Sequence, residues 1–298
     1  MSTAPPLEVQ GLTKRYGKTT AVEDLTFAIT PGRITGFLGP NGAGKTTTLR
    51  ILLGLVHASS GQALVNGMRY RRLEEPAQTV GAVLEASNFH PVRSGRNHLR
   101  VLAAAAGIPA ERVDEVLDEV ELADAADRHV EAYSLGMRQR LSVASALLGT
   151  PLLLILDEPA NGLDPEGIRW LRNFLRGFAG GGGTVFISSH VLAEVAQIAD
   201  EVVIIHRSRL LAHDSVEALT ARAAEGTVVR SPDAARLREE LVRRGLEVTG
   251  ENEELRVRAA PAPVGEIAAE AGVVLHELRG EGASLEEVFL ELTGSEGT

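Results

Sequence analysis

Cysteine is absent from the 298 residues, and lysine occurs only at positions 14, 18 and 45. Without thiols the chain can form neither disulfides nor thiolate metal sites, which suits a reducing compartment. Long apolar runs are also missing, since the most apolar stretch, residues 142–156, is interrupted by Gly149 and Pro151. A membrane-spanning helix needs about 18 or more apolar residues, and residues 1–10 show no basic and apolar leader. We therefore expect a protein that is neither secreted nor embedded in a membrane.

An excess of positive charge is lacking as well. Lysine and arginine together number 30 against 40 aspartates and glutamates, which gives a formal net charge of −10. Proteins that bind nucleic acids present basic surfaces to the phosphate backbone, so we expect no nucleic-acid partner. A chain of 298 residues has room for one large domain and one small one.

One stretch carries a complete phosphate-binding pattern. Residues 39–46 read GPNGAGKT and match G-x-x-x-x-G-K-[ST] at every defined position. A predicted strand precedes the loop and an apolar helical pattern follows it at 47–55. In such a loop the backbone N–H groups and the helix N-terminus converge on phosphate oxygens. We expect Lys45 to reach the β- and γ-phosphates, Thr46 to bind Mg²⁺, and the whole set of nucleotide contacts here to be Gly39, Asn41, Gly42, Gly44, Lys45, Thr46 and Thr47.

The surrounding pattern predicts an α/β fold with a helical insertion. Strands are predicted at 7–10, 25–29, 34–38, 62–66, 80–84, 152–156, 184–190 and 202–206, with a turn at 14–17. The run at 152–156 is continuously apolar, as in a parallel strand buried on both faces. Asp157 and Glu158 follow it, at the strand edge where α/β sheets bind ligands. Residues 96–148 instead show alanine and leucine at helical spacing.

From residue 7 to about 215 the chain resembles the ATP-binding subunits of ABC transporters. The parts that carry the resemblance occur in the family's order: Tyr16, the phosphate loop, Glu85, the signature-like segment YSLGMRQR at 133–140, the apolar strand with Asp157 and Glu158, NGLD at 161–164, and His190. The resemblance implies ATP as the nucleotide and Mg²⁺ as its metal.

The resemblance also implies a role for each matching residue. Tyr16 would stack on adenine and Asp157 would bind Mg²⁺, usually through water. Glu158 would orient and deprotonate the attacking water, and His190 would touch the γ-phosphate. The implied catalytic residues are therefore Glu158, His190 and Lys45, and the implied metal-binding residues are Thr46, Asp157 and Glu85.

Two positions depart from the usual family form. Leu135 stands at the first glycine of the signature, which keeps Ser134 and Gly136. Glu85 stands where glutamine is usual, a change that resembles antibiotic-exporter ATPases. In the family the helix start at Ser134 and Gly136 faces the γ-phosphate held by the other subunit. The resemblance therefore implies a dimer, with a second copy of the chain or a homologous ATPase subunit, that encloses ATP.

The region beyond about residue 226 has a different pattern. Its predicted order is strand (227–230), helix (233–244), hairpin (246–248 and 255–258), helix (264–271) and strand (273–278), which is the ferredoxin-like βαββαβ order. A closing helix after Ser284 carries an apolar stripe of Leu285, Val288, Phe289 and Leu292. We expect that stripe to pack on the tail's own sheet or on the other subunit. The ending ASLEEVF at 283–289 resembles that of exporter ATPases linked to antibiotic self-resistance.

We therefore predict an α/β P-loop NTPase domain of the ABC type at residues 1–220, with a helical subdomain at about 86–148. A small ferredoxin-like α+β domain is predicted at residues 226–298. The implied function is ATP hydrolysis that powers export of a drug, antibiotic or lipid-like substrate through a separate membrane permease, at the cytoplasmic face of the cell membrane. Membrane contact would be made only through that permease, and Phe89 is predicted to fill a permease-facing groove. The alternatives are the ATPase of an importer and a soluble ABC protein that is not coupled to transport.

Overall fold

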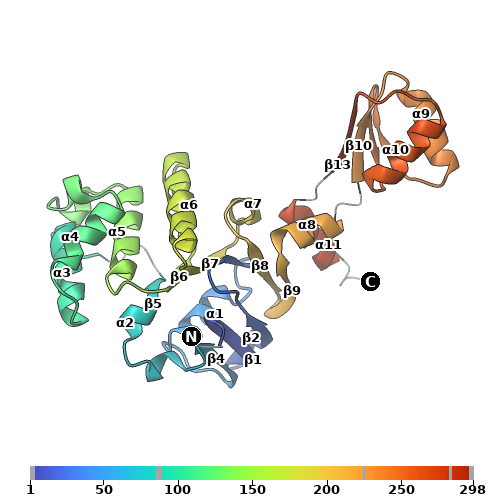
Figure 1. Cartoon of the computed structure of the whole chain (residues 1–298). Helices are drawn as coiled ribbons and strands as arrows, with labels where there is room; N and C mark the ends of the chain where they lie inside the picture. Colours follow the sequence, from blue (N-terminus) through green and yellow to red (C-terminus); the bar gives the residue numbers. More distant parts are fainter. Residues whose placement is uncertain (1–3, 85–88, 224–225, 282–283, 295–298) are drawn as a thin grey trace. The chain divides into compact units, whose positions relative to one another are not determined.

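The computed structural model describes every residue except 1–3, 85–88, 224–225, 282–283 and 295–298. Two compact units make up the chain, Met1–Asp214 and Ser215–Thr298. We expected the first domain to extend to residue 220, but the helix α8 (Val216–Ala223) groups with the second unit. Figure 1 shows the elements of each unit.

The first unit is built on a 6-stranded sheet with the order β5-β6-β7-β3-β8-β9. Its strands are β3 (Ile34–Leu38), β5 (Val80–Val83), β6 (Leu153–Asp157), β7 (Thr184–Ser189), β8 (Glu201–His206) and β9 (Arg209–Ser215). The pairs β5–β6, β6–β7, β7–β3 and β3–β8 are parallel. Every residue of β3, β6 and β7 is buried, as continuous apolar strands require. The predicted parallel sheet is confirmed, whereas β9 was not predicted.

The strand β9 follows β8 through a tight turn at Arg207 and Ser208. Both residues have positive φ, 45° and 71°, the geometry of a two-residue hairpin turn. Neither residue is glycine or asparagine, so the sequence carries no ordinary signal for this turn.

A second, antiparallel sheet has the order β2-β1-β4. It consists of β1 (Leu7–Tyr16), β2 (Thr19–Ala28) and β4 (Ser60–Val65). The turn predicted at 14–17 lies slightly later, because β1 continues to Tyr16 and the chain reverses at Gly17, which has a φ of 57°. Register shifts along β1 break the strict alternation by which a long strand is recognised in a sequence.

Helices cover these sheets and form the insertion. The helix α1 (Lys45–Leu52) buries Leu49 and Leu52 among the side chains of both sheets. The insertion comprises α3 (Gly95–Ala105), α4 (Arg112–Glu119) and α5 (Leu135–Leu147), which share one apolar cluster with β6 and β7. Ser94 and Ser134 are the N-caps of α3 and α5. Their side chains accept hydrogen bonds from the backbone N–H groups of Asn97 and Met137, respectively. The remaining helices of this unit are α2 (Pro76–Thr79), α6 (Pro165–Gly180) and α7 (Leu192–Ala196).

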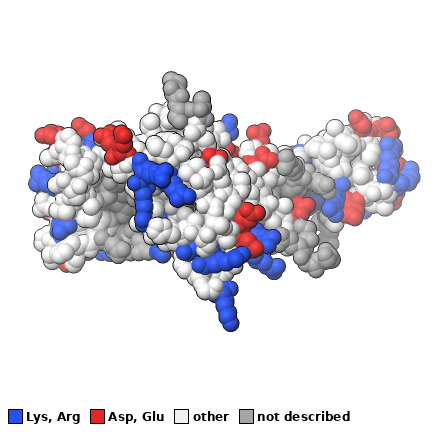
Figure 2. Space-filling model, turned by 90° about the horizontal axis from the view of Figure 1, so that it is seen from below, with Lys and Arg blue, Asp and Glu red and all other residues white. Residues whose placement is uncertain are grey.

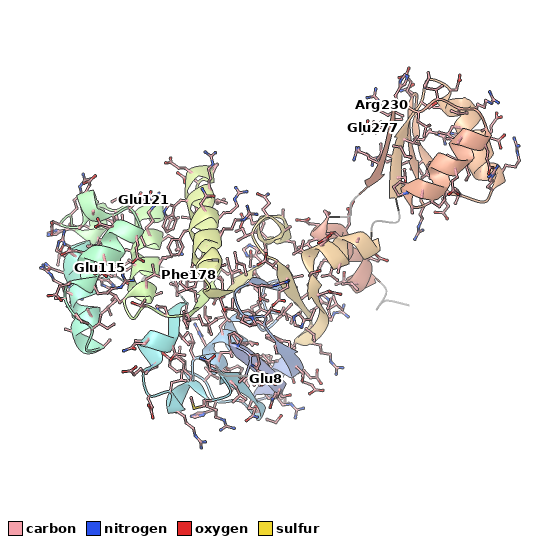
Figure 3. The ribbon with its side chains drawn as sticks, viewed as in Figure 1. Glu8, Glu115, Glu121, Phe178, Arg230 and Glu277 are labelled. Atoms are coloured by element: carbon pink, nitrogen blue, oxygen red, sulfur yellow. The ribbon has the colours of Figure 1, made fainter. Side chains whose placement is uncertain are left out.

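The second unit contains a 4-stranded antiparallel sheet with the order β11-β12-β10-β13. Its elements are β10 (Gly226–Arg230), α9 (Ala234–Arg243), β11 (Val248–Glu251), β12 (Glu254–Val257), α10 (Pro261–Glu270) and β13 (Glu277–Glu281). The helices α9 and α10 share one core with Val229, Leu255 and Val257. Arg230 and Glu277 lie opposite each other on β10 and β13 (Figure 3). The element order is the βαββαβ order expected from the sequence.

One strand of this unit is shifted from its predicted position. The last strand was predicted at 273–278, but β13 begins at Glu277. Val273 instead fills the core from the turn after α10 and is only 7% exposed. An apolar residue that packs from a turn produces the same local pattern as the start of a strand.

The closing helix α11 (Leu285–Gly294) packs against α8. Leu285 and Val288 are buried, at 1% and 4% exposed, yet neither belongs to the core under the four-stranded sheet. The expectation that the stripe packs on the tail's own sheet is therefore wrong. The partner helix α8 precedes the sheet in the chain, so these first and last helices of the unit form a pair (Figure 1).

Candidate functional site

The phosphate loop lies between β3 and α1, where close packing requires glycine at two positions. A Cβ on Gly44 would collide with the carbonyl oxygen of Ala21, and one on Gly39 would collide with that of Ile205. The φ of Gly44 is also 107°, a conformation that favours glycine. These two glycines therefore let the loop lie directly against β2 and β8, which carry Ala21 and Ile205.

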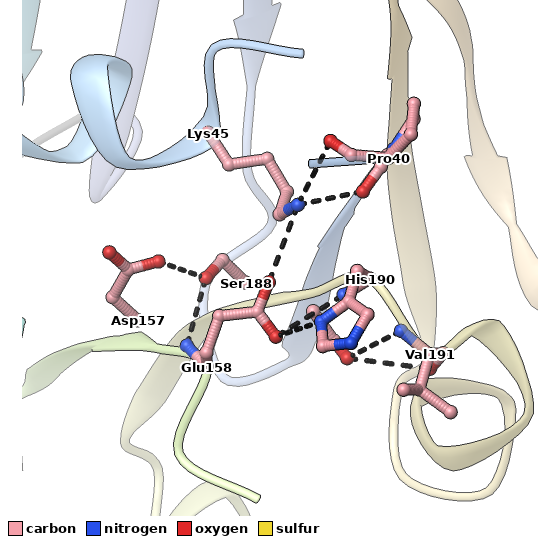
Figure 4. Close-up of polar contacts among 9 residues, drawn as sticks. Pro40, Lys45, Asp157, Glu158, Ser188, His190 and Val191 are labelled. Atoms are coloured by element: carbon pink, nitrogen blue, oxygen red, sulfur yellow. Dashed lines mark hydrogen bonds and ion pairs between the residues drawn. The ribbon is translucent and has the colours of Figure 1, made fainter. Parts of the chain in front are cut away.

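Lys45 is the first residue of α1 and its ammonium group lies inside this loop (Figure 4). Its side chain is 6% exposed. The Nζ atom donates to the carbonyl oxygen of Gly39 at 2.7 Å and lies 3.3 Å from Oε1 of Glu158. A buried ammonium group held this way can exchange its carboxylate partner for a phosphate oxygen, since both are anionic acceptors.

Asp157 is the last residue of β6, Glu158 follows it, and both contact Ser188 on the neighbouring strand β7. The Ser188 hydroxyl donates a short hydrogen bond to Oδ1 of Asp157 and accepts one from the backbone N–H of Glu158 at 3.0 Å. Glu158 has a φ of 49°, a strained value for a residue with a side chain. The turn it makes directs the Glu158 carboxylate towards Lys45 and leaves Asp157 buried behind it (Figure 4).

His190 completes the constellation from the end of β7. Its Nδ1 lies 2.8 Å from Oε2 of Glu158, and its backbone N–H donates to the same oxygen at 3.3 Å. The imidazole is 37% exposed and the Glu158 side chain 24%. Glu158 therefore uses one carboxylate oxygen for Lys45 and the other for His190, which holds the carboxylate in a single orientation.

These residues surround a cavity of about 380 Å³. Its walls are formed by loop residues, both partners of the ion pair and His190; the full set is Ala21, Asn41, Gly42, Gly44, Lys45, Thr46, Thr47, Glu158, Asn161 and His190. The structure therefore gathers most of the predicted site residues in one place. Asn161 and Ser188 were quoted in the sequence analysis only as part of motifs and strands. Ser188 lies opposite Asp157 in the parallel register of β6 and β7. That register, and no local pattern in the sequence, identifies Ser188 as a site residue.

Several predicted site residues lie outside this cavity. Ser134 and Gly136 are at the start of α5 and do not line it, and neither does Tyr16, which is 49% exposed. The Nζ atom of Lys14 lies 4.6 Å from the centre of the Tyr16 ring, a cation–π arrangement on an exposed aromatic. Glu85 falls outside the described residues.

The donor set at the cavity fits a magnesium ion better than a closed metal site. In the described part of the chain, no group of three or more His, Cys, Asp or Glu side chains is placed to hold a metal. Thr46 lines the cavity. Asp157 is not among the lining residues but precedes Glu158, and it offers a carboxylate whose second oxygen is not used by Ser188. Mg²⁺ takes one or two protein oxygens and completes its shell with water and substrate phosphates. Thr46 and Asp157 would hold it here.

A second carboxylate fixes the sheet that carries the loop. Glu201 at the start of β8 accepts hydrogen bonds from the N–H and hydroxyl of Thr30 at 3.0 and 2.8 Å and from the Thr35 hydroxyl at 2.7 Å. Burial alone would raise the pKa of Glu201, but these hydrogen bonds and the nearby His213 together lower it. Its charged form therefore ties β3, and with it the phosphate loop, to β8.

The comparisons with known proteins agree with this geometry. The ABC transporter family pattern matches residues 22–161, and a domain of unknown function matches residues 225–286. The bacitracin transport ATP-binding protein BcrA of Enterococcus faecalis is 35% identical over 300 residues, which cover 98% of this chain and 97% of that protein. The Nod factor export ATP-binding protein I of Burkholderia orbicola is also 35% identical, with 99% of both chains covered.

A solved structure resembles the whole chain. It is described as an ATP-binding subunit of an ABC transporter and superposes with a TM-score of 0.68 at 26% identity, over 96% of this chain and 99% of that one. No helix in the described residues is long and apolar enough to span a bilayer. The chain therefore belongs to the family of ABC transporter ATP-binding proteins, and it is an ATPase whose turnover is coupled to transport.

Proposed function

We propose that this chain powers the export of a drug, antibiotic or lipid-like substrate through a separate membrane permease at the cytoplasmic face of the membrane. The single observation that carries its catalytic part is the contact of one carboxylate, Glu158, with both Lys45 and His190 at the phosphate loop. Support for the direction of transport comes from relatives named for bacitracin transport and Nod factor export. These relatives do not favour the importer or the soluble alternative.

In the proposed reaction Glu158 accepts a proton from water as the water oxygen attacks the γ-phosphorus of ATP. The bond from that phosphorus to the β-phosphate oxygen breaks, and ADP and phosphate result. Lys45 and the loop N–H groups stabilise the charge on the transferring group, and His190 positions Glu158 and contacts the γ-phosphate. Bound Mg²⁺ would neutralise phosphate charge. Asp157 would hold the ion, and Ser188 fixes the orientation of Asp157.

The second part of the proposal concerns a dimer. Ser134 and Gly136 do not line the cavity of their own chain, yet a Cβ on Gly136 would meet little, its nearest neighbour being the Ser134 hydroxyl at 3.9 Å. This helix start therefore has space for an approaching ligand. We assign it to the γ-phosphate bound by a second copy of the chain or by a homologous ATPase subunit, and Tyr16 to the adenine base.

The permease contact belongs on the helical insertion, but Phe89 is a poorer candidate than the sequence suggests. Its ring packs edge-on against His98, with centroids 4.9 Å apart, and is partly buried against the insertion core. Beside it, Val92 and Val101 are 58% and 48% exposed and line one shallow hollow. Exposed apolar side chains that share a hollow mark interaction sites. We therefore place the permease contact at Val92 and Val101.

An experiment on cells tests the export function. The chain and its partner permease are expressed in a bacitracin-sensitive host, and growth inhibition by bacitracin is measured. Resistance that is present with the wild-type chain and lost with Lys45→Ala supports export of this class of substrate. If the Lys45→Ala cells are as resistant as wild type, ATP hydrolysis by this chain does not drive the export.

A further inference from the structure

A second, basic pocket lies between the end of α1, the strand β4 and the short helix η1 (Tyr70–Arg72). Its volume is about 300 Å³. The side chains of interest in its lining are His57, Arg69, Tyr70, Arg71 and Arg72. It shares no lining residue with the cavity at the phosphate loop. The pocket is therefore separate from the site of ATP hydrolysis.

The lining of this basic pocket is unusual for such an acidic chain. No aspartate or glutamate is among its lining residues, although the chain has a net charge of −10. Within the described contacts, Arg69 and Arg72 form no ion pair and are exposed. Seen from below, Figure 2 shows Lys and Arg side chains gathered in patches over the part of the first unit that Figure 1 draws at the bottom. Among the residues that the structure describes, no carboxylate forms an ion pair with Arg69 or Arg72.

The third arginine is held in place by the protein backbone. Arg71 donates from Nε to the carbonyl oxygen of Gly54 at 2.8 Å, just beyond the end of α1. A Cβ on Gly54 would come within 2.9 Å of the Arg71 side chain. This contact uses one of five guanidinium N–H groups and leaves the others available. Arg71 is therefore oriented in advance of any ligand.

Tyr70 supplies a neutral donor between the arginines. Its ring is half-buried and packs against the core under the two sheets of the first unit. Burial raises the pKa of the phenol, so the hydroxyl remains protonated at neutral pH. Among the described contacts the hydroxyl has no hydrogen-bond partner. A ring that is anchored in the core and presents a free hydroxyl is suited to ligand recognition.

We propose that this basic pocket binds a phosphate-bearing anion. Guanidinium groups match phosphate oxygens with paired hydrogen bonds, and three of them occur here with a phenol and an imidazole. The volume lies at the lower end of the range for ligand pockets, about 300 Å³, which suits one phosphate group and part of its carrier. A free phosphomonoester and the headgroup of an anionic lipid present the same chemistry to these residues.

Binding of inorganic phosphate tests the proposal on the full chain. The cavity at the phosphate loop is first saturated with a non-hydrolysable ATP analogue, and equilibrium dialysis then measures phosphate binding. The double variant Arg69→Gln/Arg72→Gln weakens binding by about tenfold or more, because two charge-assisted contacts are lost. Tyr70→Phe weakens it by about threefold. The control is Arg33→Gln, which removes one positive charge from an exposed site outside the pocket and leaves binding unchanged.

Vesicles distinguish the two sources of the anion. Co-sedimentation is compared for phosphatidylcholine vesicles with and without phosphatidylglycerol. If anionic vesicles bind the chain and the Arg69→Gln/Arg72→Gln variant binds them much less, the phosphate belongs to a lipid headgroup. If inorganic phosphate binds in the arginine-dependent way and vesicles do not, the ligand is a soluble phosphomonoester. If neither probe distinguishes wild type and Arg33→Gln from the double variant, the proposal is wrong.

Discussion

Lys45 and Glu158 form an ion pair across the phosphate loop, with Nζ and Oε1 at 3.3 Å. The same ammonium group donates to Gly39, and the same carboxylate contacts His190 through its other oxygen. A triphosphate that enters the loop offers Lys45 a second anionic partner. We therefore expect nucleotide binding to release one oxygen of Glu158 from Lys45.

The shared hydroxyl of Ser188 gives the first prediction. Ser188→Ala removes the donor to Asp157 and one of the two acceptors of the Glu158 N–H, which keeps the Ser188 carbonyl oxygen at 3.2 Å. Asp157 therefore loses its fixed orientation and Glu158 is held less firmly. We expect the turnover rate to fall at least about tenfold and unfolding free energy to drop by about 1 to 3 kcal/mol. Ser145→Ala is the matched control, because that hydroxyl only bonds back to Leu141 in α5. A Ser188→Ala enzyme with wild-type turnover would remove this positioning role.

Glu201 predicts a pH dependence of stability. Its pKa in the folded state lies below the ordinary value of 4.5, so its contribution is complete above pH 4.5 and is lost as pH falls through the folded value. Urea unfolding as a function of pH measures this loss. In Glu201→Gln the unfolding free energy is lower at pH 7 and falls less steeply below pH 4.5. Equal slopes for wild type and variant in that range would contradict the assignment.

The packing of α11 on α8 leads to a prediction about which residue of α11 stabilises this helix pair. Leu285 is 1% exposed and Leu290, on the same helix, is 67% exposed. Leu285→Ala lowers the stability of the helix pair by about 2 to 5 kcal/mol, whereas Leu290→Ala has almost no effect. Backbone hydrogen exchange measures the effect of each variant. In Leu285→Ala, faster exchange should appear in α8 and α11 and not in α9 or α10. Faster exchange in α9 and α10 as well would show that the apolar stripe of α11 packs on the four-stranded sheet and its helices.

The proposed permease contact is tested by charge. Val92→Asp and Val101→Asp replace the exposed valines of the hollow with carboxylates and should abolish copurification with the permease, while ATP hydrolysis by the isolated chain stays at the wild-type level. The control is Val242→Asp, since Val242 is 55% exposed on α9 of the other unit. If both insertion variants copurify normally, the contact lies elsewhere on the chain.

The correct predictions from the sequence concern segments whose local residue pattern is typical of a single structure. The phosphate loop, the apolar strand before Asp157 and the helical insertion were all found from spacing alone. The hairpin at Arg207 and the partner of Leu285 were missed because neither has a local signal. A positive φ at Arg207 is imposed by the sheet, and an apolar stripe does not identify what covers it.

In the candidate site, too, the motifs identify individual residues, whereas the contacts between them depend on the fold. Lys45 and Glu158 could be named from their motifs, but their mutual contact depends on the φ of 49° at Glu158, which no propensity indicates for glutamate. Ser188 contacts Asp157 because β6 and β7 pair in a register that places the two residues opposite each other. Parallel register joins residues that are 31 positions apart in the chain, so sequence spacing alone does not reveal it.

The role of Glu158 is tested by measuring ATP binding and ATP turnover side by side in wild type, Glu158→Gln and Lys45→Ala. The glutamine keeps the shape of Glu158 but cannot accept the proton, so we expect near wild-type ATP affinity with turnover lowered by about 10² to 10⁴. Lys45→Ala should instead weaken ATP binding itself, by about 1.5 to 3 kcal/mol. Turnover in Glu158→Gln equal to that of wild type would contradict the account, because Glu158 would then not be the base.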